Sequence, residues 1–379
     1  MPKRIRPFFL MILFIFTPCL LPAKSIRVAA ITDMTGPNRS VQKPLLQTIE
    51  FGVNRINQKS IETGLSINLV KLDSKGTVIG ARMAAKEAVD RKSSAVIGPL
   101  RSSAALAAAS VLQKAGVVMI TPTATNPSVT LQGSYIFRTC YTDTFQGKVL
   151  AEFAVSSLNA FTAAVLINAE NRYSTGLAES FIKNFSSLGG TIVYQADYLE
   201  KVTDLEKMVM KVRPEKPDVI FIPGYSRDAG AIIKKIRKQG LTSFLLGGDG
   251  WGTASIGKYA KDAVNGAFRT GFWHPELPGS KSRSFVKEFR NIHGNIKRQD
   301  IAGAYEAVLL LARAARNAES DNPADIRDSL NQIHNFEGLT GHMRFNKNGD
   351  PLKSIVILKY EKRQPMFYKT IAHETLLKK

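Results

Sequence analysis

Short apolar runs alternate with amphipathic segments through the first part of the chain. The apolar runs have the length and composition of buried strands, and the segments between them have the apolar spacing of helices. We expect strands at 26–32, 66–72, 94–98 and 117–120, and helices at 41–57, 77–91 and 102–114. This alternation predicts a mostly parallel sheet covered by helices on both faces.

The alternation breaks at residues 135–143 and then restarts as a second α/β series of similar size. The second series predicts helices at 145–158, 174–188, a segment ending at 212, and 228–239, with strands at 162–168, 190–198, 218–224, 243–248 and 266–273. The tail has helical patterns at 281–292, 300–318 and from Pro323, and we expect strands to return only after Gly349-Asp350. We therefore predict an α/β fold of two lobes, with the chain passing between them more than once.

The N-terminus has the layout of a secretory signal peptide. Lys3, Arg4 and Arg6 precede an apolar run at 8–21, and Ala23 offers a small residue for cleavage. The run is short for a membrane span, although an uncleaved anchor remains the alternative. We predict a cleavable signal at residues 1–23 and an exported mature chain, whose one remaining cysteine, Cys140, has no partner for an intramolecular disulfide.

The chain is strongly basic, with 52 Lys and Arg against 31 Asp and Glu and a net charge of +21. The basic residues are scattered, and the densest group, at 234–238, lies on an amphipathic helical pattern. No nucleic-acid-binding motif accompanies them, so we expect a solvated basic surface and no nucleic-acid partner. Attraction to an anionic membrane surface stays open.

Polar loops follow four of the predicted strands. Ligands of parallel α/β sheets bind beyond the carboxyl ends of strands, where helix N-termini present free N–H groups. The loops at 98–103 and 121–127 are rich in hydroxyls, which suits a carboxylate. The loops at 223–226 and 247–252 supply a phenol, an indole and a carboxylate, which suits an ammonium group beside an apolar side chain. Together they predict a site for an α-amino acid, whereas any one loop alone could be ordinary helix capping.

A set of motifs in a fixed order then links the chain to a known family. They extend from Val28 to Asp350 and read "VAAITDMTGP", "AVIGPLRSSAALAAASVLQKAGVVMITPTATNPSVT", "YIFRTCYTDTFQGKVLAEF", "NRYSTGLAESF", "PDVIFIPGYSRDAG", "FLLGGDGWG" and "FEGLTGHMRFNKNGD". The chain resembles the type I periplasmic solute-binding proteins of the branched-chain amino-acid receptor family, which are similar to Leu/Ile/Val-binding protein and serve ABC importers.

The resemblance implies two lobes, each a mostly parallel sheet flanked by helices, joined by three crossing segments. These would place hinges near 139–144, 271–275 and 349–353. The first lobe would then hold residues 24–140 and 275–350, and the second lobe residues 141–274 and 351–379. The ligand would bind between the lobes, which close on it by hinge motion.

The resemblance also implies roles for six residues. Ser102 and Thr125 would bind the ligand carboxylate through hydroxyl and backbone N–H groups, and the carbonyl of Thr123 would accept from the ammonium. From the second lobe, Tyr173 and Tyr225 would close on the ligand, and Asp249 would pair with the ammonium.

Two departures from the family pattern leave the ligand's side chain open. The loop at 38–41 lacks the aromatic residue that some members place near the side-chain pocket, and Asp249 is shorter than the glutamate of several amino-acid binders. Trp251, Trp273 and Tyr225 could line an apolar pocket, which favours branched-chain, other apolar or aromatic ligands, or could belong to the lobe cores.

Other classes of function have weaker support in the sequence. The Gly-x4-Gly-Lys spacing at 252–258 is followed by Tyr259, so the magnesium ligand of a phosphate loop is missing. The five histidines show no metal-ligand spacing, and no nucleophile elbow is present, so we expect no cofactor, no metal and no enzyme activity. We predict a monomeric, periplasmic amino-acid-binding protein that delivers its ligand to an ABC permease. The alternative is a sensory protein of the same fold that binds an amide or small carboxylate.

Overall fold

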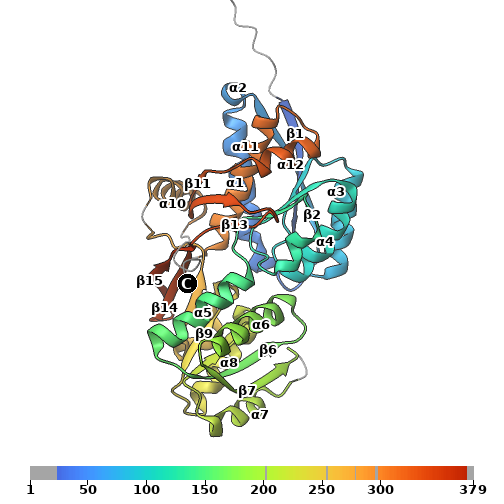
Figure 1. Ribbon diagram of the computed structural model, residues 1–379. Helices are drawn as coiled ribbons and strands as arrows, with labels where there is room; N and C mark the ends of the chain where they lie inside the picture. The colour runs from blue at the N-terminus through green and yellow to red at the C-terminus, as the bar shows by residue number, and fades with distance from the viewer. Residues whose placement is uncertain (1–23, 201–202, 253–254, 278, 295–297, 374–379) are drawn as a thin grey trace, which may run out of the picture.

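The computed structural model describes residues 24–200, 203–252, 255–277, 279–294 and 298–373. The predicted signal peptide at 1–23 lies outside these residues. Two α/β lobes are stacked one above the other, with β1, α3 and α4 in one and β6, α7 and α8 in the other (Figure 1). The predicted fold class is confirmed.

The first lobe is built on a five-stranded sheet of order β2-β1-β3-β4-β5, in which every neighbouring pair is parallel. Side chains alternate between the faces of a strand, so Val28 and Ala30 pack on one side of β1 while Ala29 and Ile31 pack on the other. Both faces are covered by helices, which explains why these strands are nearly continuous apolar runs. The strands are β1 (Lys24–Thr32), β2 (Leu65–Asp73), β3 (Ala95–Ile97), β4 (Val118–Thr121) and β5 (Ile136–Arg138).

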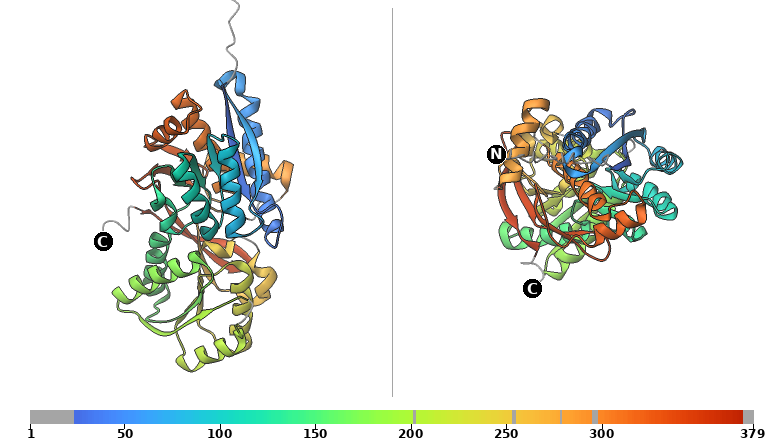
Figure 2. Two further views of the ribbon diagram at one scale, coloured as in Figure 1. Left: turned by 90° about the vertical axis from the view of Figure 1, so that its right-hand side faces the viewer. Right: turned by 90° about the horizontal axis from the view of Figure 1, so that it is seen from above.

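Helices from two distant parts of the chain cover this sheet (Figure 2). One core forms against α1 together with the late helices α11 and α12, and the other against α3 and α4. The helices of this lobe are α1 (Arg39–Gln58), α2 (Ser60–Thr63), α3 (Val78–Asp90), α4 (Ser102–Ala115), α10 (Ser280–His293), α11 (Asp300–Ala318) and α12 (Pro323–Asn331), with a 3-10 turn η1 (Pro127–Gln132).

The second lobe is built on a seven-stranded sheet of order β15-β14-β10-β9-β8-β6-β7. Its first five strands in chain order are parallel, and β14 and β15 add an antiparallel edge. The strands are β6 (Thr162–Asn168), β7 (Thr191–Tyr198), β8 (Val219–Phe221), β9 (Phe244–Gly247), β10 (Phe268–Gly271), β14 (Ile355–Glu361) and β15 (Gln364–Ile371).

Helices cover both faces of the second sheet as well. Val165 on β6 packs in a core with α5 and α6, and its neighbour Leu166 packs in the opposite core with α7, α8 and α9. The helices are α5 (Asp143–Leu158), α6 (Arg172–Ser187), α7 (Leu205–Val212), α8 (Ser226–Lys238) and α9 (Ile256–Ala260), with 3-10 turns η2 (Arg213–Glu215), η3 (Asp249–Gly252) and η4 (Lys261–Val264).

A small third sheet corrects one prediction. Strands were expected to return only after Gly349-Asp350, but β11 (Phe336–Gly338) and β12 (Gly341–Phe345) come earlier and pair with β13 (Pro351–Leu352). Both strands are short and alternate between buried and exposed residues, with Phe336 and Met343 reaching the first lobe's core. Such short alternating strands carry a weak hydrophobic signal in the sequence.

The chain passes between the two large sheets at three places. It leaves the first sheet between β5 and α5, returns between β10 and α10, and leaves again between β13 and β14. The residue limits given above for the two lobes stay a prediction. Among the described residues, none of the helices has both the length and the apolarity that a membrane span requires.

Candidate functional site

The turn between β3 and α4 places Ser102 at the start of a helix. Gly98 has φ +98°, and a Cβ there would lie 2.3 Å from the carbonyl oxygen of Ile31, so the turn requires glycine. The helix has no side-chain cap and no acidic residue in its first turn, and Ser102 is buried. The partial positive charge at this helix start is therefore not balanced by a local carboxylate.

The loop after β4 lies against this helix start. Asn126 donates its backbone N–H to Ser102 Oγ at 3.3 Å, and Thr123 Oγ1 donates to the carbonyl of Leu100 at 2.7 Å. The Thr123 hydroxyl thus holds the two loops together, while the role predicted for this residue belongs to its carbonyl. Thr125 is fully buried, and its hydroxyl interacts with the Asp143 carboxyl.

Two stacked tyrosines come from the second lobe. Tyr173 lies in the first turn of α6 and Tyr225 immediately precedes α8, and their rings stack with centroids 5.2 Å apart at 27°. The Tyr173 hydroxyl accepts a hydrogen bond from the backbone N–H of Gly250 at 2.9 Å. Burial raises the pKa of both phenols, so both rings remain uncharged.

Asp249 begins the turn after β9 and is held by Gln146 of α5. The Gln146 amide donates to Asp249 Oδ1 at 3.1 Å and accepts from the Asp249 backbone N–H at 2.8 Å. Burial raises the pKa of the Asp249 carboxyl to about 6. The preceding Gly248 makes room for the tyrosine, since a Cβ there would lie 2.2 Å from Tyr173 Oη.

Asp143, at the N-terminus of α5, is a site residue that the sequence analysis missed. It is fully buried, its backbone N–H donates to the Thr125 carbonyl at 2.8 Å, and its Oδ1 accepts from the Gln146 amide at 3.3 Å. Burial, followed by the neighbouring charge of Asp249, raises its pKa well above the usual range. The sequence predicted that this helix begins at 145, so Asp143 was left outside it, whereas in the structure α5 begins at Asp143 and the spacing of three places Asp143 and Gln146 on one helix face.

Buried polar atoms gather among these residues. Three of the buried side-chain oxygens that make no hydrogen bond of good geometry within the described ranges lie here: Thr125 Oγ1, Asp143 Oδ2 and Tyr141 Oη. Weaker side-chain interactions remain, from Thr125 to Asp143 and from Thr270 to Tyr141. Burying such atoms costs free energy unless something binds them. Together with Asp249, these groups indicate a ligand site whose carboxyl oxygens can accept hydrogen bonds from a ligand and whose hydroxyls can donate hydrogen bonds to it.

The two lobes touch at the edge of this site. The guanidinium of Arg101 lies 4.2 Å from the centroid of the Tyr225 ring, and the Asn126 amide donates to the Arg172 carbonyl at 2.7 Å. The Arg172 backbone N–H also donates to Ser103 Oγ at 3.4 Å. A cavity of about 320 Å³ opens next to these contacts, lined by residues of both lobes that include Arg101, Ser103, Asn171 and Tyr225.

The structure thus places the six predicted site residues in two groups, one on each lobe, and of the six Tyr225 lines the cavity described above. Ser102, Thr123 and Thr125 form one group on the first lobe, and Tyr173, Tyr225 and Asp249 form the other on the second. Asp143 joins the groups through its backbone bond to Thr125 and its side-chain bond to Gln146. Arg101, Asp143 and Gln146 were not predicted.

Both tryptophans are buried in the apolar cores of the molecule. The indole N–H of Trp251 donates to the Ile222 carbonyl at 3.0 Å, and that of Trp273 donates to Ser282 Oγ at 3.0 Å. Both rings are almost completely buried in the apolar clusters beside the second sheet.

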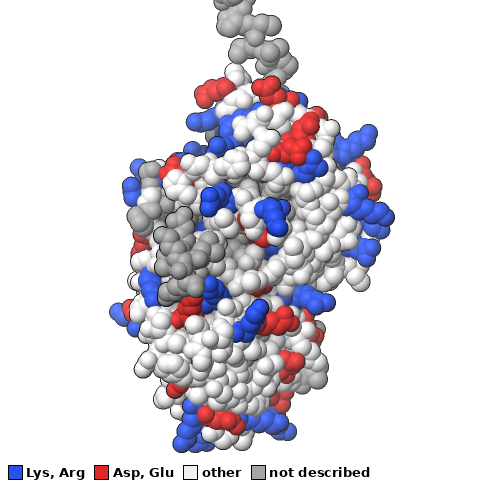
Figure 3. All heavy atoms as spheres, viewed as in Figure 1, with Lys and Arg blue, Asp and Glu red and all other residues white. Residues whose placement is uncertain are grey.

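The basic residues do not gather into one patch on the face seen in Figure 3, where Lys and Arg are interspersed with Asp and Glu over both lobes. Within the group at 234–238, Lys235 and Lys238 both pair with Glu206. No group of three potential metal ligands occurs among the described residues. Part of the Gly-x4-Gly-Lys segment, residues 253–254, lies outside them.

A family model described as periplasmic binding protein matches residues 25–364 of the chain. Leu/Ile/Val-binding protein homolog 1 of Brucella abortus is 29% identical over 335 residues, which cover 87% of this chain and 88% of that protein.

Solved structures of amino-acid-binding proteins are similar to this chain over most of its length. The leucine binding protein LivK of Thermotoga maritima is 28% identical, with a TM-score of 0.88 over 92% of this chain and 99% of that one. The branched-chain amino acid transporter substrate binding protein LivJ of Streptococcus pneumoniae, in complex with isoleucine, is 25% identical, with a TM-score of 0.84 over 92% of this chain and 99% of that one.

Proposed function

The chain belongs to the periplasmic binding protein family, and from this premise we propose that it binds a free α-amino acid between its lobes for an ABC importer. The observation that carries the proposal is the cluster of buried polar groups where the lobes meet, including the Thr125 hydroxyl and the carboxyls of Asp143 and Asp249. Groups of opposite charge lie there. The start of α4 on the first lobe carries partial positive charge, and the second lobe supplies carboxylates. An α-amino acid has the matching charges, on two groups attached to the same carbon.

The carboxylate of the ligand would lie against the first lobe. The start of α4 lacks an acidic cap, and the hydroxyls of Ser102 and Thr125 lie beside it, so both can donate to an anion. Backbone N–H groups of the same helix start add donors and a favourable dipole. Charge-assisted hydrogen bonds of this kind contribute about 1.5–3 kcal/mol each.

The ammonium group would lie between the lobes. Asp249 offers a carboxylate already oriented by Gln146, and the Thr123 carbonyl is the acceptor that the family resemblance assigns. Asp143 adds a second buried carboxylate. A cationic ligand would relieve the repulsion between these two acids and favour their ionised forms.

The side chain would face the rings of Tyr173 and Tyr225. Aromatic faces favour apolar side chains, and the relatives named above bind leucine or isoleucine by their names or bound ligands. L-Leucine, L-isoleucine and L-valine are therefore the first candidates, followed by other apolar and aromatic amino acids.

The cellular setting belongs to the same proposal. Residues 1–23 would be a cleaved signal peptide that exports the chain to the periplasm. There the mature protein would act as a monomer, close on its ligand and deliver it to the permease subunits. The family is a class of solute-binding proteins, and we propose no catalytic step.

A thermal-shift screen of the mature chain tests the function. The panel contains the twenty amino acids, small carboxylates and the amides of the best amino acids. A ligand that binds only the folded state raises the melting temperature by mass action. We expect apolar amino acids to give the largest shifts, and shifts only with compounds that lack a carboxylate would refute the proposal.

A further inference from the structure

Arg138 is a fully buried arginine at the end of β5, where the chain leaves the first sheet. Its Nη1 donates to the Ala124 carbonyl at 2.6 Å and its Nη2 to the Asn126 carbonyl at 2.9 Å. These two carbonyls flank Thr125, whose own carbonyl instead accepts from the backbone N–H of Asp143. The guanidinium therefore sets the orientation of the peptide groups on both sides of a predicted ligand residue.

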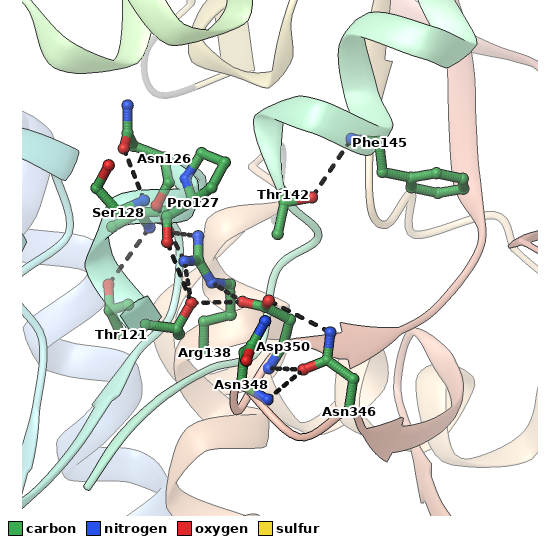
Figure 4. Close-up of polar contacts among 12 residues, drawn as sticks. Thr121, Asn126, Pro127, Ser128, Arg138, Thr142, Phe145, Asn346, Asn348 and Asp350 are labelled. Atoms are coloured by element: carbon green, nitrogen blue, oxygen red, sulfur yellow. Dashed lines mark hydrogen bonds and ion pairs between the residues drawn. The ribbon is translucent and has the colours of Figure 1, made fainter. Parts of the chain in front are cut away.

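The other side of the guanidinium is bound to the last crossing. Arg138 Nε lies 2.8 Å from Asp350 Oδ1, and the Thr130 hydroxyl accepts from Arg138 Nη2 at 2.8 Å and donates to Asp350 Oδ1 at 2.7 Å. Asp350 lies just before β13, in a turn that Asn346 closes by accepting the Asp350 backbone N–H at 3.0 Å. Figure 4 shows Arg138 between the loop that carries Asn126 and Pro127 and the turn that carries Asp350.

These contacts join three parts of the molecule that are distant in sequence. Arg138 is the last residue of β5, so it stands at the entry to the first crossing, and Asp350 stands at the entry to the third. Buried charges require several good hydrogen bonds, and here two of the partners are ligand-loop carbonyls. A movement of either crossing would therefore change the position of the loop at 121–126.

We propose that Arg138 is a positioning residue for ligand binding, which acts through the loop at 121–126. It holds the loop so that Thr125 and the Thr123 carbonyl face the cleft, and through Asp350 it connects this arrangement to the crossings between the lobes. The expected change in ligand affinity rests on the proposed function. The expected change in hydrogen exchange of the loop can be measured without a ligand.

A second buried ion pair offers a matched control. Lys353 and Glu306 are both almost fully buried and 3.5 Å apart, and Lys353 Nζ donates to the Thr139 carbonyl at 2.7 Å. Glu306 also accepts from the backbone N–H of Thr340 at 2.8 Å. The pair thus joins the same first and third crossings, but it does not contact the carbonyls beside Thr125. It reaches the ligand loop only through Thr139, whose hydroxyl donates to the Pro122 carbonyl at 3.2 Å, and Glu306→Gln leaves the bond from Lys353 to Thr139 in place. Glu306→Gln should destabilise the fold without moving the ligand loop.

The experiment compares Arg138→Gln, Thr130→Val and Glu306→Gln in the mature chain. Thr130→Val keeps the side-chain shape but removes the hydroxyl that bridges Arg138 and Asp350, so it serves if Arg138→Gln fails to fold. Calorimetry measures Kd for L-isoleucine and for its carboxamide, and hydrogen exchange measures the amides of residues 121–127 without ligand. Denaturant unfolding measures the stability of each variant.

We expect Arg138→Gln to weaken isoleucine binding by about 30-fold or more, and Thr130→Val by about threefold to tenfold, given the strength of charge-assisted bonds. The preference for isoleucine over its carboxamide should fall, and exchange at 121–127 should accelerate. Glu306→Gln should lose stability yet keep Kd within twofold and loop exchange unchanged.

The proposal is overturned if loop exchange in Arg138→Gln and Thr130→Val matches that of Glu306→Gln, or if the affinity for isoleucine falls only in proportion to the lost stability. A wild-type protein that binds no amino acid refutes the proposed function instead. In that case the exchange comparison still decides whether Arg138 positions the loop.

Discussion

At the scale of single residues, Asp249 should make the protein sensitive to pH. Its folded pKa of about 6 lies above the ordinary 3.8, because burial disfavours the charged form. The folded state therefore holds this proton more tightly than the unfolded chain between about pH 4 and 6, and the free energy of unfolding of the ligand-free protein should fall as pH rises through that window. Denaturant unfolding at several pH values measures this.

Ligand binding should show the opposite dependence. An ammonium group prefers the ionised carboxylate, so affinity should increase as pH rises to about 6 and then level off, by up to about tenfold per pH unit below 6. Calorimetry of wild type and Asp249→Asn tests it, with Asp90→Asn on the exposed face of α3 as control. Because Asp143 is also buried with a raised pKa, some dependence should persist in Asp249→Asn. Equal pH profiles for wild type and Asp249→Asn would contradict the role given to Asp249.

The hydroxyls of Ser102 and Thr125 carry the carboxylate end of the site. Ser102→Ala combined with Thr125→Ala should weaken amino-acid binding by at least about a hundredfold, because two bonds to a charged group are lost. Removing the Thr125 hydroxyl also removes its interaction with the buried Asp143 carboxyl, so denaturant unfolding measures the stability of the double variant beside its affinity. Ser110→Ala, an exposed serine on the same helix, is the control. Unchanged affinity in the double variant would mean that the ligand carboxylate lies elsewhere.

At the scale of elements, the contact between the start of α4 and the loop before α8 should stabilise the closed arrangement. Arg101 lies over the Tyr225 ring, and such cation–π contacts contribute about 0.5–2 kcal/mol. Arg101→Ala should therefore weaken binding by about twofold to thirtyfold, mainly through faster dissociation. Stopped-flow kinetics measures both rates, and Arg82→Ala on exposed α3 makes the same change in charge as a control. A change confined to the association rate would instead indicate electrostatic attraction of the ligand.

The elements also show why sequence patterns worked where they did. Strands such as β1 and β6 are buried on both faces and read as continuous apolar runs, and loops at the carboxyl ends of parallel strands could be named as the site in advance. The sequence pattern did not predict strands β11 and β12, because both are short and partly exposed.

The missed site residues have a different reason. Asp143 contacts Thr125 and Arg101 contacts Tyr225, so each residue belongs to the site because of a contact with another segment of the chain. The spacing of residues within one segment does not show which distant segments will meet. The buried bond of Arg138 to Asp350 is a further example, since the two residues are far apart in sequence and meet only where the chain crosses between lobes.

At the scale of the whole molecule, the account predicts a ligand-dependent closure. The structure has the lobes in contact through Arg101, Asn126 and Arg172, which is the arrangement expected around a bound ligand. Small-angle scattering should show a smaller radius of gyration with saturating ligand than without. Identical scattering in both conditions would contradict hinge closure.

The central claim is that the cleft recognises both charges of an α-amino acid. It is tested most directly by calorimetric titration of the mature chain with L-leucine, L-isoleucine and L-valine, each beside its carboxamide and its decarboxylated amine. The account predicts one molecule bound per chain and affinities for the amino acids at least about a hundredfold higher than for either analogue, because each analogue leaves buried polar groups unpaired. Analogues that bind as tightly as the amino acids, or no binding by any compound with a free carboxylate and ammonium, would contradict it.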